Sequence, residues 1–176
     1  MTVTVIQFEP ARALEQVLYV AKRLQHPSFH TISKVLYFAD KEHLSRYGSL
    51  LTGDTYVAMR YGPVPSATYN LLKAAAGRRE ALIPSEWYDL VKGALTVEGE
   101  HRVRARRDAR ADLISASQRE CLDTSIRENG RLGFQKLVDK SHDGAWRSAD
   151  QNEIIELAAI AKTLPNAKEV LAYLAR

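Results

Sequence analysis

The chain has 176 residues, of which 45% are hydrophobic and 26% are charged, and its formal net charge is +4 at pH 7. This composition excludes an intrinsically disordered protein, and the length suits a domain with a sizeable core. A mildly basic chain permits a nucleic acid or an acidic protein as partner but requires neither. The single cysteine, Cys121, excludes an internal disulfide and a cysteine-based structural metal site.

The sequence has no membrane or export signal. No apolar run approaches the roughly 20 residues of a membrane-spanning helix. Residues 1–10 lack the basic start and the apolar centre of a signal peptide. We therefore expect a cytoplasmic protein without a membrane partner, folded as a single domain over residues 1–176.

Two helices are predicted in the N-terminal part of the chain. Residues 1–9 alternate weakly between apolar and polar types, and we expect a short strand or an extended arm there. Residues 11–25 carry apolar side chains at helical spacing, and residues 30–47 give the clearest helical pattern of the chain. Gly48 follows the second helix, at the place where a left-handed cap residue belongs.

A strand, a turn and a third helix are predicted next. Residues 55–61 are rich in β-branched and aromatic types, which favours a short strand. Residues 62–66 hold two prolines, and we expect a rigid turn there because each proline fixes its own backbone. A helix is predicted over residues 66–76, with Gly77 past its end.

The second half of the chain is expected to begin with a β-hairpin. Residues 93–107 place two alternating runs on either side of a short loop that contains glycine. A capping box that starts at Ser117 predicts a helix from about residue 118 to residues 129–130. Residues 132–139 are expected to form another short helix.

Two further helices are predicted toward the C-terminus. Residues 151–162 place Ile154, Leu157, Ala158 and Ala161 on one apolar face, and Asn166 starts a last helix. The predicted fold is therefore mainly α (α+β), with a small antiparallel sheet built from the hairpin and the 55–61 strand. Its predicted core includes Leu14, Leu18, Leu36, Phe38, Leu72 and Ile154.

A long ordered motif runs from Ile32 to Tyr69. Its helical part spans Lys34 to Asp40 and is followed by His43 and Gly48. A Thr-Gly-Asp turn, an extended Tyr-Val-Ala-Met segment and a Gly-Pro-Val-Pro-Ser segment complete it. This order resembles the Panacea domain, the SocA-like antitoxin family. Residues 141–146, with a Ser-His pair followed by Ala-Trp, are similar to a later part of the same family pattern.

The resemblance implies binding, without catalysis and without a cofactor. Members of this family resemble antitoxins that neutralise a cognate toxin protein by direct contact, and one type also delivers its toxin to a protease. We expect a rigid helical scaffold to present the turn-strand-turn segment over residues 52–66, because aromatic, arginine and pre-ordered proline contacts carry interface energy. The expected partner-binding residues are Asp54, Tyr56, Arg60, Tyr61, Pro63, Val64 and Pro65. The residues expected to maintain the motif are Lys34, Tyr37, Asp40, His43, Gly53, Gly62, His142 and Trp146.

A metal-assisted hydrolase is an alternative function. Asp40 and His43 lie three apart on a predicted helix, and with Asp54 and His142 they form a candidate metal or acid–base cluster. The structural interpretation, which we favour, is a buried polar network. In it Asp40 bridges the Thr-Gly-Asp turn and His43 donates to a backbone carbonyl.

A nucleic-acid-binding regulator is a further alternative, and we rank it below the others. Arg102, Arg104 and Arg106 alternate along a predicted strand, and Arg107 and Arg110 extend the patch. A solvated edge strand is the simpler interpretation, since no aromatic residues interleave with these arginines. Trp146 is expected in the core, whereas Trp87 and Tyr88 suit either the core or an interface.

Overall fold

The structure is a computed structural model that describes residues 7–78 and 83–176. The predicted fold class is confirmed, because the chain is mainly helical with small antiparallel sheets. The longer helices are α1 (Pro10–Arg23), α2 (Phe29–Tyr47), α3 (Ser66–Ala75) and α5 (Ala116–Asn129). The shorter ones are α4 (Ser85–Lys92), α6 (Phe134–Ser141), α7 (Gly144–Arg147), α8 (Leu157–Lys162) and α9 (Ala167–Leu174), with a 3₁₀ turn at Ala111–Leu113. The strands are β1 (Tyr56–Met59), β2 (Gly62–Pro65), β3 (Leu95–Glu98), β4 (Arg102–Ala105) and β5 (Ile154–Ile155).

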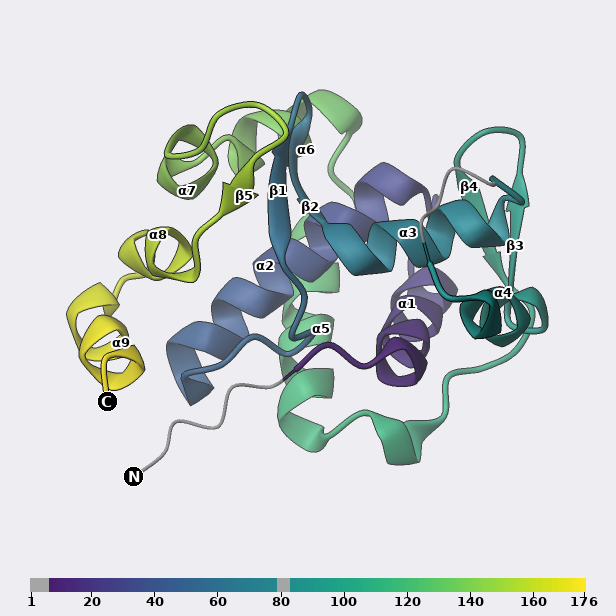
Figure 1. Cartoon of the computed structure of the whole chain (residues 1–176), viewed down its shortest axis with the longest axis horizontal. Helices are drawn as coiled ribbons and strands as arrows, with labels where there is room; N and C mark the ends of the chain where they lie inside the picture. The colour runs from purple at the N-terminus through teal and green to yellow at the C-terminus, as the bar shows by residue number, and fades with distance from the viewer. Residues whose placement is uncertain (1–6, 79–82) are drawn as a thin grey trace.

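Helix α2 is the central element of the fold. Its N-cap residue, Ser28, accepts a hydrogen bond from the Thr31 amide, and Gly48 ends it in a left-handed conformation with φ of 74°. Figure 1 shows α2 crossing the middle of the molecule. Helices α7, α8 and α9 lie toward one end, and α3, α4 and the β3–β4 hairpin lie toward the other. Helix α2 therefore contributes side chains to both halves of the interior.

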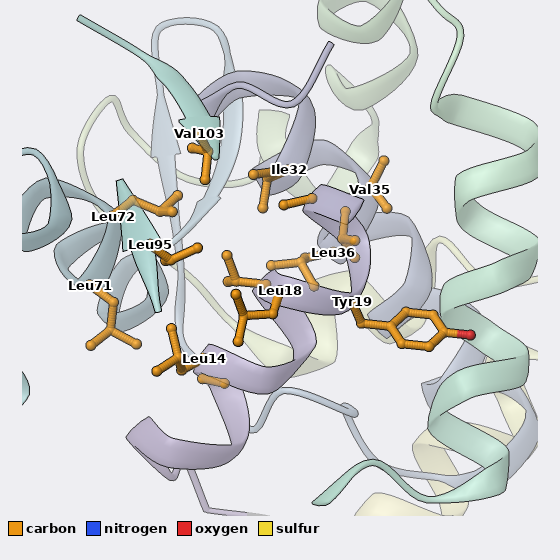
Figure 2. Packing of buried hydrophobic residues seen from close by; sticks show 14 of the residues in the cluster. Leu14, Leu18, Tyr19, Ile32, Val35, Leu36, Leu71, Leu72, Leu95 and Val103 are labelled. Atoms are coloured by element: carbon orange, nitrogen blue, oxygen red, sulfur yellow. The ribbon is translucent and has the colours of Figure 1, made fainter. Parts of the chain in front are cut away.

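The larger hydrophobic cluster joins α1, α2, α3 and the β3–β4 hairpin. Leu14, Leu18, Leu36 and Leu72 are buried there, which confirms four of the predicted core residues. Figure 2 shows them converging with Leu95 and Val103 of the hairpin and with other side chains of α2 and α3. Burying one such side chain contributes about 1.5–3 kcal/mol, so this cluster supplies much of the stability of the fold.

A second hydrophobic cluster lies on the other side of α2. It combines Tyr37 and Leu44 of α2 with Tyr56 of β1 and Ile160 of α8. Phe38, predicted in the core, is only partly buried and packs against this cluster. The aromatic rings of Tyr37 and Tyr56 meet edge to face at a centroid separation of 5.1 Å, which joins the helix to the strand.

The prediction of a helix over residues 151–162 is wrong in its first part. Ile154 and Ile155 form the short strand β5, which pairs with β1 opposite Val57 and Tyr56, and the helix α8 begins only at Leu157. Successive side chains of a strand point to opposite faces. Ile155 is therefore buried whereas Ile154 is 55% exposed, so Ile154 does not belong to the core.

The segment predicted as a rigid turn over residues 62–66 is instead the strand β2. It pairs antiparallel with β1 from Met59 opposite Gly62 to Tyr56 opposite Pro65. The strand order is β2-β1-β5, so β2 is an edge strand. An edge strand tolerates prolines because its outer side needs no N–H donors. The turn itself is the two-residue step Arg60–Tyr61.

The β3–β4 hairpin is confirmed, but it does not join the strand at residues 56–59 in one sheet. The two form separate sheets, β2-β1-β5 and β3-β4. The helix that follows the hairpin begins earlier than predicted, because its capping box is formed by Ser115 with Gln118, and Ser117 lies inside the helix. Helices α4 and α7 had no prediction, and the expected arm over residues 1–9 lies largely outside the described residues.

Candidate functional site

The Thr-Gly-Asp turn is held to α2 by a buried carboxylate. Asp40 accepts hydrogen bonds from the Thr52 amide at 3.0 Å, the Thr52 hydroxyl at 2.5 Å and the Tyr56 hydroxyl at 2.7 Å. Burial raises the pKa of Asp40 to about 6, although these donors act in the opposite direction. These contacts agree with the structural interpretation of Asp40 as a bridge to the turn.

The second carboxylate of the motif caps the next helix. Asp54 accepts hydrogen bonds from the amides of Thr55, Ala67 and Thr68 and from the Thr68 hydroxyl. The N-cap residue of α3 is Pro65, which has no side-chain acceptor to offer. Asp54 therefore fixes the direction in which α3 leaves β2.

The two parts of the sequence motif meet in space, although about a hundred residues separate them. Asp143 accepts hydrogen bonds from the Tyr37 hydroxyl at 2.9 Å and from Lys41 Nζ at 2.8 Å, while its other oxygen caps α7. Trp146 donates from Nε1 to the Met59 carbonyl at 2.9 Å, and its ring stacks on His142 at 3.6 Å. The β1–β2 hairpin is thus clamped between α2 and α7.

Lys34 is buried behind the hairpin. Its side chain is 1% exposed, and Nζ donates to the Pro63 carbonyl at 2.9 Å. Burial lowers the pKa of Lys34 to about 7. Gly62 makes this approach possible: its φ is 105°, and a Cβ there would lie 2.9 Å from Lys34 Cε and would overlap Ser141 Oγ. Glycine alone tolerates both the positive φ and the close approach of the Lys34 and Ser141 side chains.

An aromatic surface surrounds the end of the hairpin, and we refer to Arg60, Tyr61 and Phe134 as the hairpin-tip surface. Tyr61 is 48% exposed and Phe134 is 50% exposed, and their rings meet at a centroid separation of 5.2 Å. Arg60 lies over the Tyr61 ring, and His30 of α2 lies 4.3 Å from Phe134. Beneath this surface is a pocket of about 540 Å³ that Lys34 also lines.

Most of the predicted partner-binding residues are not on the surface. Asp54, Tyr56, Pro63, Val64 and Pro65 are buried, because β2 packs on α2 and α3, Tyr56 packs against Tyr37 of α2, and Asp54 is used as a cap. Arg60 and Tyr61 are exposed at the turn. Of the seven residues, these two alone offer side chains to a partner in this structure.

The candidate metal or acid–base cluster does not form. His43 contacts the Ser49 carbonyl through Nδ1 at 2.7 Å, which makes Nδ1 the donor, whereas Asp40, Asp54 and His142 each have different partners. Within residues 7–78 and 83–176, no group of three or more His, Cys, Asp or Glu side chains is placed to hold a metal ion. Gly53, also expected to maintain the motif, adopts a positive φ of 65° in the turn.

The arginines of the β3–β4 region are largely occupied by carboxylates. Arg104 pairs with Glu98 across the hairpin, and Arg110 pairs with Asp112. Arg107 makes a two-pronged contact with the buried Glu15 of α1, at 2.6 and 2.9 Å. This last pair attaches the segment after β4 to the core, so the arginines of the segment do not act as one uncompensated patch for phosphates.

Sequence reasoning missed Phe134 and His30. Neither residue belongs to a recognisable motif. Phe134 is the first residue of the short helix α6, and its apolar ring is not part of the buried face of that helix. This apolar ring outside the buried face was the one available signal. Trp87, left open between core and interface, is half-buried against Phe8. Trp146, predicted in the core, is only partly buried and packs against the second cluster.

Comparison with known proteins defines the class of this helical module. The sequence model described as antitoxin SocA-like, Panacea domain, matches residues 32–147, which is more than half of the chain. The chain belongs to this antitoxin family. Comparisons with curated proteins and with solved structures gave no match. Among the helices of the described residues, none is both long enough and apolar enough to cross a membrane.

Proposed function

We propose that this chain is an antitoxin that binds a cognate toxin protein by direct contact in the cytoplasm, without catalysis. Membership of the antitoxin family supports a role of this general kind. The observation that carries the proposal is the hairpin-tip surface, where Arg60, Tyr61 and Phe134 stand exposed within the residues that match the family. Trp, Tyr and Arg are the residue types most often found at binding hot spots.

The hairpin-tip surface is also held in place before any partner arrives. The Trp146 indole donates to the carbonyl of Met59, and the Lys34 ammonium donates to that of Pro63, so both strands are fixed close to the turn. A surface that is already ordered loses less conformational entropy on binding than a flexible loop. Exposed aromatic side chains on such a support are therefore suited to high affinity for a protein.

The test needs the toxin, which we expect to be encoded by a neighbouring gene. A neighbour that is lethal when expressed alone and harmless when expressed with this chain would identify it. The double variant Tyr61→Ala, Phe134→Ala should then weaken the complex by about 1,000-fold, since two hot-spot residues each contribute about 2 kcal/mol. Both side chains are exposed, so the variant should remain as stable as the parent chain.

Tyr47→Ala provides a matched control. Tyr47 is also an exposed aromatic residue, but it lies at the opposite end of α2, about 25 Å along the helix from His30. We expect Tyr47→Ala to bind and neutralise the toxin normally. Normal neutralisation by the double variant would show that the contact lies elsewhere. A genome neighbourhood without any toxic product, together with no co-purifying protein, would remove the antitoxin proposal itself.

Delivery of the toxin to a protease is a finer possibility within this function. It predicts that the toxin's half-life in cells shortens when this chain is present and returns to normal in a protease-deficient strain. Neutralisation by contact alone predicts an unchanged or longer half-life, because a bound protein is protected from unfolding.

A further inference from the structure

The pocket beneath the hairpin-tip surface has the size and lining of a small-molecule site. Its volume is about 540 Å³, and pockets of about 300–1,000 Å³ hold compact organic ligands. Three separate elements supply aromatic walls: Phe29 from α2, Tyr69 from α3 and Phe134 from α6. Tyr61 closes the side formed by the hairpin. An apolar body of the size of a substituted benzene ring matches such a lining.

The wall of the pocket also contains a lysine without a counter-charge. Lys34 is buried, and among the described residues its ammonium has one hydrogen-bond acceptor, the Pro63 carbonyl. An ammonium group carries three N–H donors, and a buried charge is costly unless it is paired. No carboxylate of residues 7–78 or 83–176 forms an ion pair with Lys34, and burial alone accounts for its lowered pKa of about 7.

A second polar group of the same wall lacks a hydrogen bond. His30 lies one helical turn before Lys34 on α2, and its Nε2 is buried without a partner in the described part of the chain. Burial, with a smaller contribution from the charge on Lys34, lowers the pKa of His30 to about 4, so its ring is neutral at pH 7. The backbone of Phe134 also bonds to this ring and acts on its pKa in the opposite direction. A neutral ring carries one N–H, and the tautomer that places it on Nε2 can donate to an acceptor.

We propose that this pocket binds a small carboxylate attached to an aromatic or aliphatic body. The carboxylate would supply the missing counter-charge to Lys34 and an acceptor for His30 Nε2–H, while the body packs on Phe29, Tyr69 and Phe134. One buried ammonium matches one negative charge; a phosphate would bring more charge and require more donors. The inference goes beyond toxin binding and can be tested on the chain alone.

The experiment compares phenylacetate with its neutral isostere phenylacetamide by titration calorimetry. We expect saturable one-to-one binding of phenylacetate and binding of phenylacetamide that is about tenfold or more weaker, because hydrogen bonds to charged groups are the stronger ones. Lys34→Met should weaken the binding of phenylacetate by about tenfold or more and abolish the preference for the acid over the amide. Lys162→Met, which removes an exposed lysine of α8, should change neither value.

A second variant keeps the test independent of any effect of Lys34 on folding. Phe134→Ala removes an exposed ring from the rim of the pocket. It should weaken the binding of phenylacetate and of phenylacetamide by the same factor, so that the preference for the acid persists. Lys34→Met should itself remain folded, because methionine is apolar and of similar length and replaces a desolvated charge. Failure of phenylacetate to bind at about 1 mM, or an acid preference that survives in Lys34→Met, would overturn the proposal.

Discussion

Replacing Asp54 with alanine tests whether a side chain from outside α3 caps that helix. Asp54 precedes β1 and accepts hydrogen bonds from the amides of Ala67 and Thr68, at 3.0 and 2.8 Å, and from the Thr68 hydroxyl at 2.8 Å. The variant removes the acceptor for all three donors. Because Pro65 has no acceptor on its side chain, the first turn of α3 gains no replacement from the usual capping position.

The size of the effect follows from which donors are left in the interior. Thr68 is buried, so its amide and hydroxyl lose their acceptor away from water, at about 1–3 kcal/mol each. Thr55 is exposed, and its amide can turn to water. Burial raises the pKa of Asp54, so desolvation already offsets part of its hydrogen-bond energy. We expect a loss of about 3 kcal/mol, which lowers Tm by about 6–12 °C at this chain length.

Urea unfolding followed by circular dichroism measures this loss. Asp150→Ala is the matched control, since Asp150 is exposed and its removal should change the free energy of unfolding by less than about 0.5 kcal/mol. Asp54→Asn should fall between the two, because an amide keeps one acceptor but turns a donor toward Thr68. A loss below about 1 kcal/mol for Asp54→Ala would refute the argument that this carboxylate satisfies the start of α3.

Two further predictions concern the same motif. Because burial raises the pKa of Asp40 from 3.8 to about 6, its protonated form is favoured in the folded chain; the resulting stability is present below about pH 4 and is lost as the pH rises through about 6. Asp40→Asn should lack this loss, which is about 3 kcal/mol in the parent chain. Unfolding curves at pH 4 and pH 7 measure it. An equal loss of stability between the two pH values in both chains would contradict the reasoning. Gly62→Ala should destabilise the fold by about 2–3 kcal/mol, because the new methyl group meets Lys34 and Ser141. Gly77→Ala is its control: φ is also positive, at 71°, but nothing lies within 4 Å, so only the backbone cost of about 1 kcal/mol applies, and equal losses in a thermal melt would argue against the steric explanation.

The sequence by itself determined the elements whose signals are local. The apolar spacing of α1 and α2, the left-handed Gly48 and the glycine loop of the β3–β4 hairpin each involve residues a few positions apart, and each was confirmed. Such patterns reflect the helical and strand repeats, which act within one or two turns. The main part of the motif that indicated the antitoxin family, from Ile32 to Tyr69, is also contiguous, which is why it could be recognised without a structure.

Local pattern failed where pairing with a distant segment decides the conformation. The prolines of residues 62–66 suggested a turn, but antiparallel pairing with β1 makes residues 62–65 a strand. The helical spacing of Ile154 with Leu157 suggested an inward face, but pairing with β1 turns Ile154 outward. In both cases backbone hydrogen bonds to a remote strand outweigh a weak local preference.

Only the tertiary structure placed the candidate sites. His30, Tyr61 and Phe134 come from three elements that are far apart in the chain, and their rings meet because α6 and the β1–β2 hairpin both pack near the N-terminal end of α2. The burial of Lys34 likewise depends on Gly62, which lets the hairpin approach the helix closely. A sequence shows that a lysine and a glycine are present. The lysine is buried, and the glycine is required, because the folded chain brings the two residues together and excludes water from between them.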